Sequence, residues 1–253
     1  MSTSEWSAAG LSAALMLGRA RRRVLVIDGG EPRNRFAVHM QGVLGHDGID
    51  PRQLVARGRA EAARYGVEFL DGSVEQVEEH SRGLTVSTVV GQVLWCRALI
   101  IASGIDDQLP DIPGLAERWG ASVLHCPYRH GWEVQDRRLG VLGTGPDGAA
   151  PGSTRPAMER SGLFTVGRPR PRDGFLGGLG LDRTETPMGS FLKVDATGRT
   201  SHGRIWAAGN VADPSQNVPM AIGSGAMAGG MANVALVTAD FDHAVAEPVK
   251  GAR

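Results

Sequence analysis

The segment AAGLSAALMLGRARRRVLVIDGG, residues 8–30, constrains the fold of this chain more than any other stretch. Residues 8–19 are rich in alanine and leucine, with apolar residues at helical spacing. Residues 24–27 form a short, mostly β-branched run that ends in Asp28 and a Gly-Gly turn. A helix that leads into a buried strand ending in an acid is part of the βαβ unit that binds dinucleotides. The segment therefore predicts an α/β fold.

Gly10 and Asp28 match two positions of the dinucleotide-binding pattern G-x-G-x-x-G. The last glycine of that pattern opens the helix, and an acid about 20 positions later accepts the ribose hydroxyls. The two earlier glycine positions fall on Glu5 and Ser7, and only four residues precede Glu5 where a strand should lie. We therefore expect weakened affinity for a dinucleotide. An ordinary amphipathic helix leading into a buried strand is the alternative for this segment taken alone.

The middle of the chain continues the α/β pattern. Residues 51–65 predict a helix, and residues 67–70 begin a strand after the glycine that stops it. The runs 74–77, 84–90 and 93–101 predict β-strands in hairpins. The last run ends in IIASG, where the backbone could lie close to a cofactor.

A second strand and helix close the chain. Residues 205–208 predict a short buried strand, and residues 219–237 predict a helix dense in small residues. A helix that begins directly after such a strand directs its unpaired N–H groups at whatever lies above the sheet. The alternative is a helix whose small residues serve only close packing against the sheet.

The stretch HCPYRHGWEV, residues 125–134, resembles a Cys-x-x-Cys redox motif with one cysteine exchanged. Arg129 stands three positions after Cys126, so no disulfide can form within the motif. Cys96 falls in a predicted strand and is most simply a small buried hydrophobe. His130 could favour the thiolate of Cys126 as a neighbouring cation. Two interpretations stay open: a single reactive thiol, or a loop without chemistry.

Charge and cysteine content exclude several classes of protein. The 27 basic residues balance 27 acidic ones, so nothing indicates a nucleic-acid surface. Two cysteines cannot form a disulfide framework, which favours a reducing, cytoplasmic setting. The apolar run 8–17 precedes its positive charges, unlike a signal peptide, and is too short to span a bilayer. We predict no membrane association and no metal site.

A second glycine pattern lies in LGVLGTGPDGAA, where Gly143, Gly145 and Gly148 satisfy G-x-G-x-x-G after a predicted strand. Two prolines follow in PGSTRPAMERSG and oppose a helix there. Only 14 residues separate Gly148 from Leu163, whereas a βαβ unit needs about 30. We therefore expect a second nucleotide-binding domain to be incomplete, and we interpret the motif as a remnant turn.

Read in order, these motifs resemble the bacterial thioredoxin-reductase-like flavoproteins of the pyridine nucleotide-disulfide oxidoreductase superfamily. The resemblance covers almost the whole chain. It implies an α/β fold with an FAD-binding, Rossmann-like, three-layer ββα domain built from both chain ends, residues 1–112 and 162–253. Residues 113–161 would then be a reduced remnant of the NAD(P)H-binding domain.

The resemblance also implies roles for individual residues. Cys126 would be the first redox cysteine, with His130 beside it, and Arg129 would replace the second. FAD and NADPH are the implied cofactors. The implied FAD-binding residues are Gly10, Asp28, Arg33, Asn34, Ala102, Gly104, Gly209, Asn210, Asn217 and Val218.

The implied function is that of an FAD-dependent NAD(P)H oxidoreductase of the thioredoxin-reductase-like type, impaired in this chain. Its partners would be a redox protein or a small disulfide or dithiol, and the family suggests a homodimer. The alternatives are a non-catalytic flavin-binding or interaction protein, and a single-thiol flavoenzyme reduced by a partner.

Overall fold

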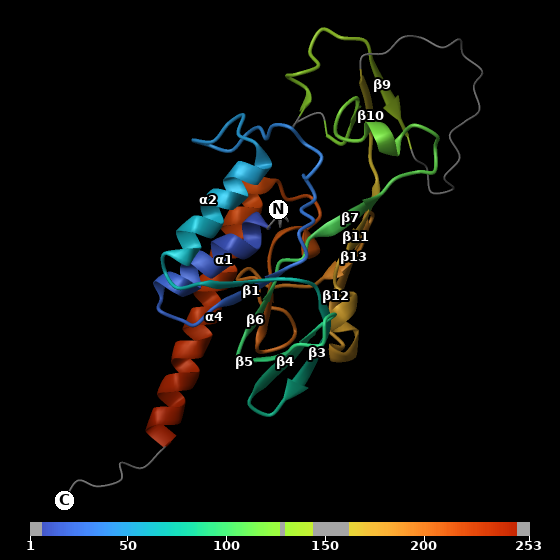
Figure 1. The fold of residues 1–253 in the computed structure, drawn as a ribbon. Coiled ribbons are helices and arrows are strands. Elements are labelled where there is room, and N and C mark those ends of the chain that lie inside the picture. The colour runs from blue at the N-terminus through green and yellow to red at the C-terminus, as the bar shows by residue number, and fades with distance from the viewer. Residues whose placement is uncertain (1–6, 127–129, 144–161, 247–253) are drawn as a thin grey trace, which may run out of the picture.

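A computed structural model of the chain describes residues 7–126, 130–143 and 162–246. Two helices near the N-terminus flank β1, a long run of strands follows, and a long C-terminal helix ends the described fold (Figure 1). The helices are α1 (Ala8–Arg19), α2 (Pro51–Ala63) and α4 (Val218–Ala246), with 3₁₀ turns η1 (Ala116–Arg118), η2 (Gly174–Leu179) and η3 (Gly209–Val211). The strands are β1 (Leu25–Asp28), β2 (Glu68–Asp71), β3 (Val74–His80), β4 (Gly83–Thr88), β5 (Val93–Cys96), β6 (Leu99–Ile101), β7 (Ile105–Gln108), β8 (Val123–Leu124), β9 (Leu139–Leu142), β10 (Gly162–Thr165), β11 (Arg168–Pro171), β12 (Arg183–Thr186), β13 (Gly189–Leu192) and β14 (Ile205–Ala207).

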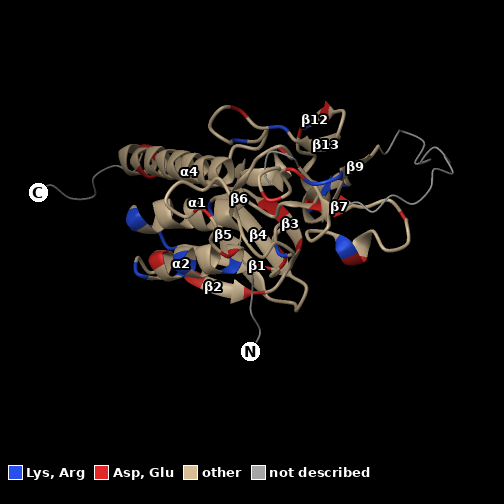
Figure 2. Ribbon diagram, turned by 90° about the horizontal axis from the view of Figure 1, so that it is seen from above, with Lys and Arg blue, Asp and Glu red and all other residues tan. Residues whose placement is uncertain are grey.

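The helices α2, α1 and α4 lie side by side in one layer, with α1 in the middle (Figure 2). Small residues on α4 allow the close contact with α1. A Cβ atom on Gly229 would lie 2.6 Å from the Ala13 carbonyl oxygen, and one on Gly225 would overlap the Ala9 carbonyl oxygen. The small residues of the last helix therefore serve packing against helix α1, whereas the sequence alternative had them packed against the sheet.

Under this layer lie two separate parallel pairs, β1 with β2 and β6 with β14. An antiparallel sheet, β3–β4–β5, forms a further layer. The sequence predicts one strand over residues 93–101. This prediction is wrong in one respect, because the segment contains two strands. The chain bends at Arg97, after which β6 joins β14 instead of continuing the antiparallel sheet.

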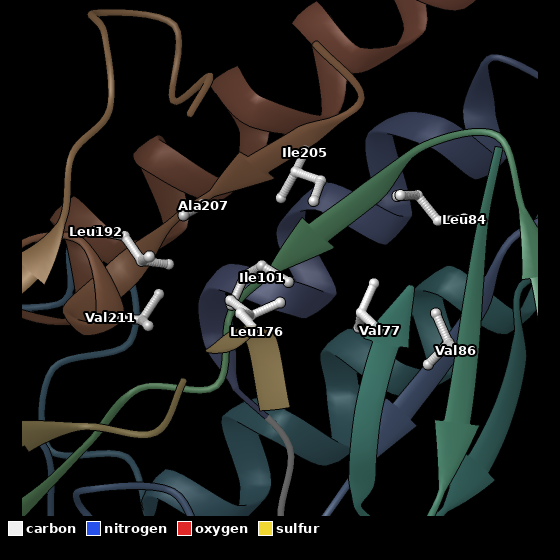
Figure 3. Close-up of a cluster of buried hydrophobic side chains, with 9 residues drawn as sticks. All are labelled: Val77, Leu84, Val86, Ile101, Leu176, Leu192, Ile205, Ala207 and Val211. Atoms are coloured by element: carbon white, nitrogen blue, oxygen red, sulfur yellow. The ribbon is translucent and has the colours of Figure 1, made fainter. Parts of the chain in front are cut away.

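The main hydrophobic core lies between these sheets. Its buried side chains come from β3, β4, β6, η2, β13, β14 and η3, and they fill the space around Ile101 (Figure 3). A second cluster of alanines around Trp206 packs α1 and α4 against β6 and β14. Because both clusters include residues of β6 and β14, this pair is covered on both faces.

The inserted segment forms a small parallel sheet in the order β8–β10–β9. Strand β10 begins at Gly162, so this sheet includes residues just beyond the boundary that we placed at residue 161, and the domain limits stay a prediction. Gly143 follows β9, as the motif requires of its first glycine. Gly145, Gly148 and the two prolines lie outside the described residues, as do Glu5 and Arg129.

Helix α4 is longer than the sequence predicts, because it continues from residue 237 to Ala246. Asp240, beyond the predicted end, forms ion pairs with Arg22 (2.9 Å) and Arg97 (2.6 Å). These arginines are distant in sequence, so no local pattern reveals the contacts. The pairs join the extension of the helix to the segments that precede β1 and β6.

Of the helices in the described ranges, α4 alone is long and apolar enough to cross a membrane, and 22% of its apolar window is buried. Its buried small residues contact α1 and β14. Its outer face is apolar and exposes Met220, Met227, Val234, Val237, Phe241 and Val245.

Candidate functional site

A cavity of about 1170 Å³ lies where α1, β1, β6 and the start of α4 meet. It is larger than most small-molecule pockets, which span about 300–1,000 Å³. All ten residues predicted to bind the cofactor line this cavity: Gly10, Asp28, Arg33, Asn34, Ala102, Gly104, Gly209, Asn210, Asn217 and Val218. The fold thus brings together segments more than 200 positions apart in sequence, while the roles of these residues stay a prediction.

The N-terminus of α1 borders the cavity through Ser7 and Gly10. Ser7 is the N-cap, its side chain makes no capping hydrogen bond, and the first turn contains no acid. The first-turn N–H groups therefore lack partners within the helix and carry its positive dipole end. A Cβ atom on Gly10 would lie 3.4 Å from the Ala102 Cβ, so the helix start packs closely on the end of β6. This arrangement favours an anionic group.

Asp28 ends β1 and borders the same cavity. Burial raises the pKa of its carboxyl group from 3.8 to about 6, against the lowering effect of the Gly30 N–H, and the nearby Asp71 raises it further. The Gly30 N–H donates to Asp28 Oδ1 at 2.7 Å. The other carboxylate lone pairs remain available to hydroxyl donors of a ligand.

The end of β6 contributes Ser103 and Gly104. The Ser103 hydroxyl oxygen is buried, and no hydrogen-bond partner for it occurs in the described part of the chain. A buried hydroxyl without a partner is costly, so a polar ligand atom here would relieve that cost. Gly104 has a φ of +72°, which glycine adopts readily and residues with a Cβ rarely do.

The side-chain amides of Asn210 and Asn217, both predicted to bind the cofactor, also stabilise the loop before α4. The Asn210 Nδ2 group donates to the carbonyl oxygens of Asp213 (3.1 Å) and Gln216 (3.0 Å). The Asn217 side-chain oxygen accepts the Met220 N–H at 3.1 Å and so caps α4. Because the NH₂ group is already used, the side-chain oxygen Oδ1 of Asn210 is the atom that could accept a hydrogen bond from a ligand hydroxyl.

Arg33 belongs to a network that the sequence analysis missed. Its guanidinium binds both carboxylate oxygens of Asp107 (2.7 and 2.8 Å) and donates to the Pro214 carbonyl oxygen (3.0 Å). It also lies 3.1 Å from His125 Nε2. Arginine can only donate, so Nε2 of His125 accepts and its proton lies on Nδ1. Arg33 thus positions Asp107 and His125 at the cavity, and these partners are too distant in sequence for a local signal.

The predicted redox residues lie at the edge of this site. Cys126 is half-buried with a free thiol, and His130, which lines the cavity, donates its backbone N–H to the Cys126 carbonyl oxygen at 3.2 Å. Burial raises the pKa of the Cys96 thiol to about 11, so that thiol stays protonated at neutral pH. Cys96 packs against the main core, as the sequence predicts.

The remaining predicted residue, Asn34, donates to Met40 Sδ at 3.7 Å. No cluster of three or more metal-ligating side chains occurs among residues 7–126, 130–143 and 162–246.

Known proteins match this chain in both sequence and fold. A "Probable thioredoxin reductase" of Arthroderma benhamiae is 34% identical over 141 residues, which cover 53% of this chain and 35% of that protein. "Thioredoxin reductase tcpT" of Claviceps purpurea is 37% identical over 144 residues, which cover 55% of this chain and 45% of that protein. The chain therefore spans less than half the length of these curated relatives.

Two solved structures match nearly the full length. HlmI is 38% identical, with a TM-score of 0.85 and coverage of 94% of this chain and 93% of HlmI. An oxidoreductase from Agrobacterium tumefaciens is 33% identical, with a TM-score of 0.85 and coverage of 92% and 96%.

The fold of the chain is that of the FAD-binding, Rossmann-like thioredoxin-reductase type, as the sequence predicts. The family described as pyridine nucleotide-disulphide oxidoreductase matches residues 7–150, which is more than half of the chain. This protein therefore belongs to the pyridine nucleotide-disulphide oxidoreductase family.

Proposed function

We propose that this chain binds FAD in the cavity between α1, β1, β6 and α4 and acts as an oxidoreductase that lacks an internal dithiol step. The observation that carries the proposal is the convergence of all ten predicted cofactor residues on one cavity. The fold brings these residues together, and the chemical character of the lining changes along the cavity. That variation matches a long ligand with a hydroxyl-rich end, a phosphate middle and an aromatic end.

The described residues fit the parts of FAD in turn. The Asp28 carboxylate would accept the adenosine ribose hydroxyls, and the first turn of α1 would face the pyrophosphate. The buried Ser103 hydroxyl would gain the hydrogen-bond partner that it lacks within the described residues. The side-chain oxygen Oδ1 of Asn210 would accept a hydrogen bond from a ribityl hydroxyl, because the NH₂ group already donates to two backbone carbonyl oxygens.

FAD, when bound, would supply a ring system that accepts and returns two electrons. The chain would stabilise the reduced ring through the N-terminus of α4 at Val218, where positive dipole density favours negative charge. The bonds from Arg33 would hold His125 at the cavity with its proton on Nδ1.

The thiol chemistry of relatives would be altered in this chain. Cys126 has Arg129 in place of a second cysteine, so a dithiol–disulfide cycle has no partner thiol within the motif. The 14 residues between Gly148 and Leu163 are fewer than a complete nucleotide-binding unit needs, so NADPH would be a poor donor and electrons would come from a partner protein or a small thiol. A non-catalytic flavin-binding protein is the competing function. It would bind FAD without turning over any donor–acceptor pair.

FAD binding is tested by titration of the purified protein, followed by flavin fluorescence. We expect weak binding that becomes weaker as the pH falls through about 6, where Asp28 becomes protonated and accepts hydrogen bonds less strongly. Ser7→Gly should tighten binding by removing a side chain at the phosphate turn. Asp28→Asn should weaken binding and remove this pH dependence, whereas Asp71→Asn, on the neighbouring strand, should retain it. Absence of FAD binding by both the wild type and Ser7→Gly would refute the proposal.

A further inference from the structure

Helix α4 carries an uncovered apolar stripe along nearly its whole length. The helix lies at one edge of the layer formed by α2, α1 and α4 (Figure 2). Its buried residues are small, and Gly225 and Gly229 lie directly against α1. On the opposite side of the helix, large apolar side chains from Met220 to Val245 are about half exposed or more. An apolar surface of this extent indicates an interaction site.

The stripe repeats every seven residues and contains a set of large residues and a set of mostly smaller ones. The large set is Met220, Met227, Val234 and Phe241, and the second set is Gly223, Gly230, Val237 and Ala244. Successive members of the two sets alternate at spacings of three and four, which is the a and d pattern of a helix that packs along a second helix. We call these residues the α4 seam. The space around the Cβ positions of Gly223 and Gly230 is open within the described part of the chain.

The seam is complementary to itself when two copies run antiparallel. Two identical helices related by a two-fold axis perpendicular to them are antiparallel, and each a residue then faces a d residue of the other copy. The layers that result are Phe241 with Gly223, Val234 with Gly230, Met220 with Ala244, and Met227 with Val237. Large side chains thus lie against small ones in most layers. A parallel pair would instead place glycine against glycine and phenylalanine against phenylalanine, which packs unevenly.

The charges on α4 suit the same arrangement. Asp240 lies beside the seam and is already paired with Arg22 and Arg97 of its own chain. In the antiparallel pair Asp240 lies near Ala226 of the second copy, whereas a parallel pair would bring the two Asp240 side chains to the same level. The antiparallel pair therefore brings no like charges together.

We propose that the α4 seam binds the α4 seam of a second copy of this chain, as an antiparallel helix pair around a two-fold axis. The exposed apolar side chains of the stripe offer roughly 100 Å² each, or about 600 Å² per copy. Two copies would then bury about 1,200 Å², which reaches the lower end of the range for specific interfaces. A lipid surface suits the stripe less well, because α4 contains no lysine or arginine that could meet anionic headgroups.

Pairing of this kind goes beyond flavin binding and does not depend on it. None of the seam residues lines the cavity between α1, β1, β6 and α4. The oligomeric state is therefore measured on the full chain without added flavin.

Sedimentation velocity of the full chain from about 1 to about 100 μM tests the pairing. We expect a monomer–dimer equilibrium. Val234→Asp puts a charge at the centre of the seam and should weaken dimerisation at least about tenfold. Val234 is 52% exposed in the single chain, so the fold of one copy should tolerate the change. The control is Val90→Asp, at a valine between β4 and β5 that is 76% exposed, and it should leave the equilibrium unchanged.

Cysteine cross-linking tests the direction of the helices. In a Cys126→Ser background, the double variant Met227→Cys/Val237→Cys should form a disulfide-linked dimer under mild oxidation, because these positions face each other in the antiparallel pair. Either substitution alone should not, since the same residue on two antiparallel helices would lie about 15 Å apart along the axis, beyond the reach of a disulfide.

Three results would each overturn the proposal. The first is a wild type that stays monomeric over the whole concentration range, whether or not it floats with vesicles of phosphatidylcholine and phosphatidylglycerol. The second is equal weakening of the dimer by Val234→Asp and Val90→Asp. The third is cross-linking of the single-cysteine variants as readily as of the double variant.

Discussion

Replacing Asp28 with asparagine should stabilise the ligand-free protein at neutral and alkaline pH. The Asp28 carboxyl group has a pKa of about 6 in the folded protein against 3.8 ordinarily, chiefly because burial disfavours its charge. Between these two values the folded state binds more protons than the unfolded state. Stability therefore falls as pH rises from about 4 to about 6, and the wild type carries the full cost of the buried charge above pH 6. Asparagine carries no charge and avoids this cost.

The size of the effect follows from the displacement of the pKa. A pKa displacement of about two units corresponds to a difference of about 3 kcal/mol in the free energy of unfolding. Asp28 is partly open to the cavity, however, so solvent screening reduces the expected effect to about 1–2 kcal/mol. Because the Gly30 N–H donates to the carboxylate at 2.7 Å, and an asparagine carbonyl oxygen can accept the same bond, the substitution should not disturb the turn.

Urea denaturation of wild type and Asp28→Asn at pH 4.5 and pH 8 measures the difference. We expect similar free energies of unfolding at pH 4.5 and a gain of about 1–2 kcal/mol for the variant at pH 8. The control is Glu61→Gln, which removes a charge of the same sign from an exposed position on α2. A gain for Asp28→Asn that is equal at both pH values, or that Glu61→Gln matches, would refute the reasoning.

Three further predictions concern the donor, the thiol and the helix packing. NADPH or NADH should bleach bound flavin slowly and without saturation in anaerobic stopped-flow, because only 14 residues separate Gly148 from Leu163 and a complete βαβ unit needs about 30; rapid, saturable bleaching at micromolar donor contradicts this. The wild type should show no disulfide reduction that depends on an internal disulfide, and Arg129→Cys should form a disulfide with Cys126 that changes the flavin spectrum. An unchanged spectrum with two free thiols would show that the loop does not dock at the flavin. Gly225→Ala should destabilise the protein by about 2–4 kcal/mol in urea denaturation, because its Cβ would overlap the Ala9 carbonyl oxygen. Gly223→Ala, with open space at its Cβ, should be neutral or stabilising by up to about 1 kcal/mol, and equal losses in the two variants would contradict the packing argument.

The sequence predicts the elements that depend on local pattern. Helix α1 and strand β1 lie where the apolar periodicity and the Gly-Gly turn place them. The beginning of α4 was predicted to within one residue, since Asn217 caps the helix after a turn. These features depend on neighbours in sequence, which is why they are readable from it.

Features that depend on distant contacts are not readable in this way. Arg33 reaches Asp107 and His125, which are 74 and 92 positions away. Asp240, in the extension of α4, forms ion pairs with Arg22 and Arg97, which lie far away in the sequence. A single sequence contains no signal for which charges will meet, because the fold alone determines those distances.

The departures of this chain from a complete dinucleotide site share one location. In the sequence pattern they are the two glycine positions that fall on Glu5 and Ser7, directly before Gly10 and the helix start that would face the pyrophosphate. In contrast, the groups suited to the two ends of FAD are present: Asp28 for the ribose and the α4 N-terminus for the ring. A ligand held at both ends loses affinity mainly through its middle, where the close backbone approach to phosphate needs glycine. Restoring glycine at Ser7 should therefore tighten FAD binding more than any change at the two ends of the site.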